Sequence, residues 1–346
     1  MENPVLSILL ITHNQRELLQ RCLDSVLAQE LQVPFEIIIS DDRSIDGTKE
    51  WVLEQKNLWE EQKSNLVEIK YVYCNSDECN PSTTSERCGW NKLTAYGHAR
   101  GKYFVNIDAD DYLRSNDIYQ MQIDMLEAHP ECSMCMQRVL SLNEGEPFEK
   151  GNAWPVHPLL REGSVIGKED FILKELRGLN QGYMIRRHSE DDMQVLYGKW
   201  FDDTVITYHH LQYGPVVFLD RTDYVWMQYP QSISHDMAAD DSLITYGLLP
   251  LHHVKMIPSL QYLFLKQGLK TMVHMMKFAP EFPQLSQQYH RYLSLKSGFI
   301  YQYYTQKSHG VCERMRYKAI RALLLVMNRY KLTSKGWLKF AKRAML

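Results

Sequence analysis

Apolar runs of strand length alternate with helix-like segments throughout the first 111 residues. Runs rich in apolar, β-branched and aromatic residues are expected to form buried strands at 5–11, 35–40, 67–73 and 103–107. Between them, helices are expected at 16–29, from about residue 49, and at about 90–99. Parallel strands need such crossover helices. The order therefore predicts an α/β fold with a mostly parallel sheet flanked by helices.

The fourth run ends in three carboxylates, Asp108, Asp110 and Asp111. In open α/β sheets, ligands bind at the carboxyl ends of the strands. Carboxylates crowded at such an end repel one another unless a cation neutralises them. Oxygen ligands of this kind suit Mn²⁺ or Mg²⁺, which they commonly share with substrate phosphates. Taken alone, the segment is also compatible with a solvated turn that happens to be acidic.

The first two runs also end in polar residues. Thr12, His13 and Asn14 follow the first, and Asp41 and Asp42 follow the second. Together with the acidic segment, in this order and at these separations, these motifs resemble the inverting glycosyltransferases of family 2, which have the GT-A (Rossmann-like) fold. The resemblance covers roughly residues 4–236 and extends to members of the bacterial surface-polysaccharide type.

The resemblance implies a nucleotide-sugar site at the strand ends. Asp42 would read the base, and because uracil offers an N–H that a carboxylate can accept, a UDP-linked donor is expected. His13 replaces the family's usual tyrosine. The complete nucleotide-sugar set implied is Thr12, His13, Asn14, Asp42, Asn91, Asp108 and Asp110. For Mn²⁺ or Mg²⁺, Asp110 is the principal expected ligand, Asp111 the second, and His235 a third unless it is an ordinary surface histidine.

An acidic pair further along the chain is the expected catalytic base. In the family, such a pair opens a helix and its second member deprotonates the acceptor hydroxyl, which implies Asp203 as base and Asp202 as its neighbour. The alternative is simple capping, because aspartate is favoured at helix N-termini. A second pair, Asp191 and Asp192, lies in a polar segment and is interpreted as a solvated loop.

Several positions depart from the family pattern. Trp90 stands in place of an arginine. Arg87 either supplies the missing cation or is a plain surface arginine. Met227 and Tyr229 stand where arginine and histidine are usual. Between the two acidic motifs, Gly182 is expected to allow a close backbone approach, and the neighbouring arginines, at 186 and 187, to meet an acidic acceptor or solvent.

Cysteine usage does not favour a disulfide framework. The seven cysteines are an odd number. Cys132 and Cys135 have the spacing of a metal or redox pair, but their alternating neighbours favour a buried strand. A reducing, cytoplasmic location is therefore expected. The sequence opens without a signal-peptide pattern, and its apolar stretches are shorter than the roughly 18–20 residues of a spanning helix.

The last third differs in character. Residues 1–236 are expected to form the GT-A domain, with a nucleotide-binding half at 1–111 and an acceptor half at 112–236. Residues 237–346 are expected to be helical. In 312–346, ten Lys/Arg against one acid give a charge of +9, which leaves −12 for the rest of a chain whose total is −3. A basic amphipathic tail favours peripheral contact with an anionic membrane surface. The alternative is a helical pair that closes the domain or forms a homodimer.

Three functions are compatible with these observations. The leading one is a metal-dependent inverting glycosyltransferase of hexosyltransferase type. It would move a sugar from a nucleotide-sugar donor to a hydroxyl of a glycan or lipid-linked glycan. The expected location is the inner face of the cytoplasmic membrane. The second is a polyprenyl-phosphate glycosyltransferase, whose anionic nucleophile needs no base. The third is a non-catalytic member that binds a glycan or a partner. A nucleic-acid partner is not expected, because the body is acidic and no recognition motif is present.

Overall fold

The computed structural model describes residues 3–63, 66–79, 84–155, 157, 160–173, 176, 180–188, 203–229, 257–260 and 263. The chain divides into two compact units, Met1–Ile233 and Ser234–Leu346. The basic tail predicted at 312–346 lies outside the described residues.

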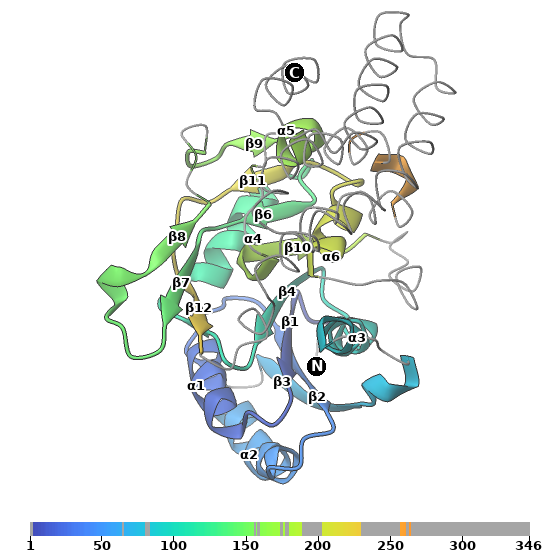
Figure 1. Cartoon of the computed structure of the whole chain (residues 1–346), viewed down its shortest axis with the longest axis vertical. Coiled ribbons are helices and arrows are strands. Elements are labelled where there is room, and N and C mark those ends of the chain that lie inside the picture. The colour runs from blue at the N-terminus through green and yellow to red at the C-terminus, as the bar shows by residue number, and fades with distance from the viewer. Residues whose placement is uncertain are drawn as a thin grey trace, which may run out of the picture. The chain divides into compact units, whose positions relative to one another are not determined.

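An eight-stranded sheet forms the centre of the first unit, in the order β3-β2-β1-β4-β10-β6-β11-β9 (Figure 1). Its strands are β1 (Leu6–Thr12), β2 (Phe35–Asp42), β3 (Val67–Cys74), β4 (Tyr103–Asp108), β6 (Met134–Met136), β9 (Val165–Ile166), β10 (Tyr183–Arg186) and β11 (Val216–Phe218). The first four strands are mutually parallel, whereas β10 is antiparallel to both β4 and β6. The sheet is thus mostly parallel at its N-terminal half and mixed beyond it.

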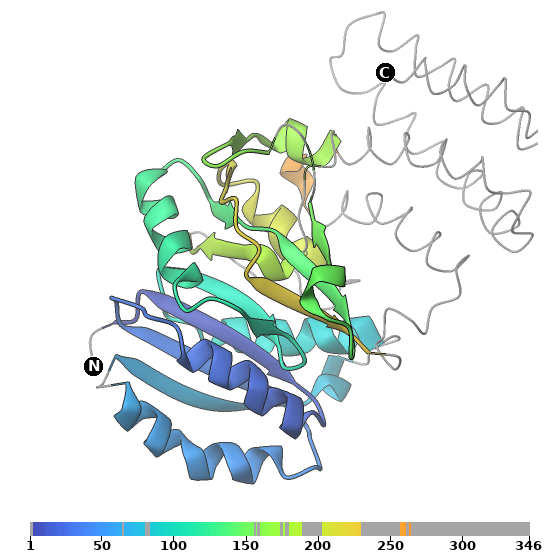
Figure 2. The ribbon, with the colours of Figure 1, turned by 90° about the vertical axis from the view of Figure 1, so that its left-hand side faces the viewer.

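Helices cover both faces of the parallel part, with α1 and α2 on one face and α3 on the other (Figures 1 and 2). The α-helices are α1 (Arg16–Leu27), α2 (Thr48–Gln62), α3 (Thr84–Gly97), α4 (Ile118–Ala128), α5 (Lys168–Leu173) and α6 (Asp203–His210). Alternate residues of β1, such as Ile8 and Leu10, join Leu19 and Leu23 of α1 in one buried core. Every second side chain of β1 therefore packs against the apolar face of α1. The α/β fold predicted from the sequence is confirmed.

A second, four-stranded sheet was not predicted. It runs in the order β5-β12-β7-β8, with β5 (Tyr112–Leu113), β7 (Val139–Asn143), β8 (Asn152–Trp154) and β12 (Tyr224–Gln228). Leu140, Val225 and Met227 form its apolar face, against which Leu18 of α1 packs. Short 3₁₀ segments occur at η1 (Ser76–Cys79), η2 (Phe148–Lys150), η3 (Asn180–Gly182) and, in the second unit, η6 (Pro258–Leu260). Among the described residues, no helix is long and apolar enough to cross a membrane.

A buried carboxylate ties the amino ends of the parallel strands together. Glu36 of β2 is fully buried and accepts hydrogen bonds from Ser7 Oγ (2.7 Å), Lys70 Nζ (2.8 Å), and the backbone N (2.6 Å) and Nε (3.1 Å) of Arg100. Burial alone would raise the pKa of Glu36, but these hydrogen bonds outweigh it and lower the pKa below its ordinary value of 4.5. The charged form is therefore the one that the fold stabilises.

Replacing Glu36 with glutamine is expected to destabilise the protein by about 3–5 kcal/mol, because two cations lose their buried partner. Since the folded pKa is lowered, the contribution of Glu36 is present above about pH 4.5 and is lost as the pH falls further. Urea denaturation at pH 7 and pH 4 measures both effects. Glu68→Gln, which removes a partly exposed partner of both Arg100 and Lys70, is the control and is expected to cost about 1 kcal/mol or less. Equal losses in the two variants would contradict this role of Glu36.

Candidate active site

The carboxyl ends of β1, β2 and β4 lie side by side. The sheet register places Thr12 opposite Asp41 of β2 and Ile11 opposite Asp108 of β4. The structure thus brings the three polar motifs of the sequence to one edge of the sheet, as predicted for ligand binding in an open α/β sheet. The hydroxyl of Thr12 is buried there and has no hydrogen-bond partner among the described residues.

The loop after β1 is held against the loop after β2. Asn14 has a φ of 53°, a left-handed conformation that asparagine tolerates better than most residues. Its backbone N–H donates to Ser44 Oγ (2.7 Å), and its side-chain oxygen accepts from the N–H of Ile45 (2.8 Å). Nδ1 of His13 donates to the backbone carbonyl of Asp42 (2.5 Å). These bonds fix His13, which is exposed, beside the end of β2.

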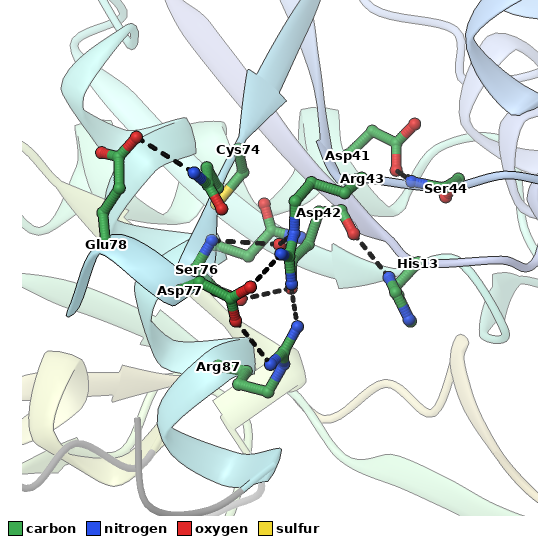
Figure 3. A network of polar contacts seen from close by, with 12 residues as sticks. His13, Asp41, Asp42, Arg43, Ser44, Cys74, Ser76, Asp77, Glu78 and Arg87 are labelled. Carbon is green, nitrogen blue, oxygen red and sulfur yellow. Dashed lines mark hydrogen bonds and ion pairs between the residues drawn. The ribbon is translucent and has the colours of Figure 1, made fainter. Parts of the chain in front are cut away.

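The carboxylate of Asp42 is buried and already hydrogen-bonded (Figure 3). It accepts from the backbone N (3.1 Å) and the hydroxyl (2.7 Å) of Ser76 in η1. Nε of Arg43 lies 3.3 Å from it, and Arg87 forms an ion pair with it at 3.6 Å. Each carboxylate oxygen can accept more than one hydrogen bond, so contact with a base stays possible. Ser76 was not predicted as a site residue.

Arg87 is part of a charged network, not an isolated surface arginine. Figure 3 shows its side chain directed from α3 toward Asp77 and Asp42. It donates to Asp77 at 2.9 Å, and Arg43 also donates to Asp77. Asp77 lies between the two guanidinium groups, which lower the pKa of its carboxyl, the hydrogen bond from Arg43 most of all. A cation thus does lie beside Asp42, although Trp90 stands at the family's arginine position.

The buried face of α3 contacts all three strand ends. Asn91 is buried, its side-chain oxygen accepts from Ser40 Oγ of β2 (2.5 Å), and its amide donates to the backbone carbonyl of Thr12 (3.2 Å). Nζ of Lys92 lies 3.1 and 3.2 Å from the two carboxylate oxygens of Asp108. Sequence reasoning missed Lys92, because nothing in its sequence neighbourhood distinguishes it from a solvated helix lysine.

Asp110 and Asp111 differ in their surroundings. Burial, and next the charge of Asp108, raise the pKa of Asp110 to about 6. Asp111 is fully buried, and its two oxygens accept from Tyr224 Oη (2.7 Å) and the backbone N of Met227 (2.9 Å). Burial, and next the charges of Asp110 and Asp108, also raise the pKa of Asp111. The carboxylate of Asp111 is therefore engaged within the protein, and its place as second metal ligand remains a prediction.

The donor set at the end of β4 fits a hard divalent cation. Mg²⁺ and Mn²⁺ are commonly bound by one or two carboxylates, with substrate phosphates and water completing the shell. Asp110 offers such a carboxylate, and the raised pKa indicates that a nearby positive charge would favour its ionised form. Arg21, another residue that the sequence did not reveal, donates to the backbone carbonyl of Asp110 (2.5 Å) and to Tyr229 Oη (3.0 Å).

One group of described residues, separate from the acidic cluster, places three ligand atoms close enough to hold a metal ion. The ligand atoms of His129, Glu131 and Cys132 all lie within 4.8 Å of one another. The guanidinium of Arg186, however, lies close by and donates to the backbone carbonyl of Cys132 (3.1 Å), which disfavours a cation there. Cys132 and Cys135 are buried free thiols, and Cys135 lies in strand β6. The strand expected from Cys132 to Val139 is thus present in part, at β6, which begins two residues after Cys132.

The structure describes only the backbone of the predicted base, and it does not describe the third predicted metal ligand. Asp203 is the first residue of α6, as expected for an acidic pair that opens a helix. The side chain of Asp203 lies outside the described residues, and so do Asp202 and His235. Their roles remain predictions.

The predicted acceptor contacts of Arg186 and Arg187 are not supported. Arg186 donates to Tyr103 Oη (3.0 Å) at the start of β4, and Arg187 donates to the carbonyl of Ala99. Both guanidinium groups therefore stabilise the end of the sheet opposite Asp108, where backbone carbonyls need donors.

Gly182 allows a close backbone approach, as expected. A Cβ at this position would lie 2.7 Å from the carbonyl oxygen of Gln137. Gly182→Ala is therefore expected to lower the free energy of unfolding by about 1–3 kcal/mol, because backbone atoms must move. Chemical denaturation measures the loss. Gly97→Ala is the matched control, since a Cβ there meets no atom within 4 Å, and it should not destabilise. An unchanged stability in Gly182→Ala would contradict this packing.

Comparisons with known proteins agree with this geometry. The structure of residues 1–349 of TarS from S. aureus in complex with UDP-GlcNAc is similar, with a TM-score of 0.61, 14% identity, and coverage of 98% of this chain and 90% of that chain. The same part of TarS alone gives a TM-score of 0.58. These similarities define the fold of the protein, which is the GT-A fold.

A family model matches part of the sequence. Residues 7–171 match the model of glycosyl transferase family 2. Proteins Mb1547 of Mycobacterium bovis and Rv1520 of Mycobacterium tuberculosis, both described as uncharacterized, are 24% identical over 237 residues. This match covers 68% of the chain and 62% of each relative, so the chain spans less than two thirds of their length.

Proposed function

We propose that the protein is a metal-dependent inverting glycosyltransferase that uses a nucleotide-sugar donor, with UDP as the nucleotide. The observation that carries the proposal is the acidic cluster at the end of β4, adjacent to the buried hydroxyl of Thr12, which has no hydrogen-bond partner in the part of the chain that the structure describes. Its donor chemistry suits a divalent ion bound together with a diphosphate. The fold similarity to TarS, whose structure contains UDP-GlcNAc, supports the choice of UDP.

Different residues bind the nucleoside and the metal ion in this proposal. Thr12, His13, Asn14, Asp42 and Asn91 hold the nucleoside at the ends of β1 and β2. Asp110 would hold Mn²⁺ or Mg²⁺, with Asp108 beside it and with Asp111 and His235 as the other predicted ligands. When bound, such an ion would stabilise the negative charge that develops on the diphosphate leaving group.

The acceptor hydroxyl is a poor nucleophile until it loses its proton. Asp203, with Asp202 beside it, accepts that proton, and attack from the side opposite the leaving group inverts the anomeric centre. The start of a helix holds a base rigidly, which supports this assignment.

We further propose that the acceptor is a glycan or lipid-linked glycan of the cell envelope. The +9 charge of 312–346, with its interspersed apolar residues, supports peripheral contact with the inner face of the cytoplasmic membrane. An acceptor carried on a lipid would be presented at that surface.

A thermal-shift panel of nucleoside diphosphates and nucleotide sugars, with and without Mn²⁺, tests the donor. A ligand at 100 times its Kd should add roughly 2.7 kcal/mol of stability. UDP and one or a few UDP-sugars are expected to raise the melting temperature, and more so with Mn²⁺. If no nucleotide shifts the melting temperature, the transferase proposal fails and a non-catalytic binding role is favoured.

A further inference from the structure

Lys92 is the most deeply buried cation at the site. Its side chain is only 4% exposed, whereas the carboxylate of its partner Asp108 is 29% exposed. A buried ammonium is costly unless it is paired. Its contact with both oxygens of Asp108 provides that pairing and fixes the carboxylate in one orientation. Water or a ligand can still reach Asp108 from its exposed side.

Lys92 also acts on the neighbouring carboxylate. Its charge lowers the pKa of Asp110, as does that of Arg21, whereas burial and Asp108 raise it. The geometry agrees, because Nζ of Lys92 lies 3.1 Å from Asp108, the last residue of β4 and two positions before Asp110. A fixed cation beside the predicted metal ligand favours an anion and opposes a divalent ion. Because it is paired to Asp108 by both oxygens, it also reduces the ability of that carboxylate to coordinate metal.

We propose that Lys92 is a positioning residue that makes tight metal binding depend on the donor. It holds Asp108 toward the donor and opposes Mn²⁺ at Asp110, so the ion binds weakly to the free protein. The negative charge of the diphosphate offsets this opposition, and the ion then binds tightly. The inference rests on the proposed function, because it assumes a diphosphate donor and a divalent ion at this site.

The test uses the full chain and two separate ligands, Mn²⁺ alone and UDP alone. Lys92→Met keeps a side chain of similar length that suits a buried position. Mn²⁺ should bind this variant more tightly, with its Kd lowered by roughly tenfold, while the Kd of UDP without metal should rise by roughly tenfold. Electron paramagnetic resonance of free Mn²⁺ and isothermal titration calorimetry of UDP at pH 7.5 measure the two constants.

Two further variants separate this role from a purely structural one. Lys70→Met removes another lysine–carboxylate bridge of the same sheet, with Glu36, and should lower the melting temperature without changing either Kd. Asp108→Asn leaves the Lys92 ammonium unpaired and should weaken Mn²⁺ binding by roughly tenfold or more, a change opposite in sign to that of Lys92→Met. Lys92→Gln, which also removes the positive charge, keeps the inference testable if Lys92→Met does not fold.

The outcomes are distinct. Opposite shifts of the two constants in Lys92→Met, with a weaker Mn²⁺ affinity in Asp108→Asn, support the inference. If both Kd values are unchanged, or if both rise together with a lower melting temperature, the inference is overturned and the proposed function stays intact. A wild-type protein that binds neither Mn²⁺ nor UDP contradicts the proposed function itself, and the inference with it.

Discussion

Replacing Asp203 with asparagine is expected to lower kcat by about 10²–10⁴, because the acceptor hydroxyl then keeps its proton in the transition state. Asparagine retains the size and the capping capacity of aspartate, so α6 should still begin at this residue. Donor affinity is expected to stay within about twofold, since a base that acts on the acceptor contributes little to donor binding. Release of UDP from the donor identified by thermal shift, with a panel of glycan acceptors, measures the rate.

Asp192→Asn is the matched control for this prediction. It removes a carboxylate of the rival acidic pair and should leave the rate within about twofold, if that pair is a solvated loop. An Asp203→Asn variant with the activity of the wild type would contradict the base assignment. Such a result would favour the polyprenyl-phosphate alternative, in which the nucleophile is already anionic.

Replacing Asp110 with asparagine is expected to abolish the Mn²⁺-dependent part of UDP binding. An amide is a weaker ligand for a hard cation than a carboxylate, and the local charge that attracts the ion falls by one. The loss should be at least roughly 100-fold in the Kd of UDP with Mn²⁺, because ion and diphosphate bind together. Titration calorimetry with Mn²⁺ and with EDTA separates the metal-dependent part.

The control for Asp110 is Asp124→Asn. Asp124 is an exposed carboxylate of α4 that accepts a hydrogen bond from Gln120. This substitution makes the same chemical change away from the strand ends and should leave both titrations unchanged. Wild-type affinity in the Asp110→Asn variant would show that the ion, or the nucleotide, binds elsewhere.

The residues that could be predicted from the sequence lie where local pattern and chemistry coincide. Each parallel strand is an apolar run, and a polar cluster marks the point where it leaves the sheet. Because parallel strands end at one edge, Thr12, Asp42 and Asp108 could be placed together before their contacts were known. The positions of Gly182 at a close backbone approach and of Asp203 at a helix start also followed from residue type.

The residues that could not be predicted act through contacts distant in sequence. Arg21 reaches Tyr229, which is 208 positions away, and no local pattern indicates that pairing. Lys92 is identified only by its burial against Asp108. Asp111 was predicted as a site residue, but its bonds to Tyr224 and Met227 could not be. The second sheet escaped prediction because its strands are two to five residues long, too short for alternation to be distinguished from chance.

A crystal structure of the protein with UDP and Mn²⁺ tests the central claim most directly. We expect the nucleotide at the carboxyl ends of β1, β2 and β4, with the base near His13 and Asp42. The anomalous signal of Mn²⁺ should lie about 2–2.5 Å from a carboxylate oxygen of Asp110 and contact the diphosphate. UDP bound away from these strand ends, or an ion held by His129, Glu131 and Cys132 instead, would contradict the account.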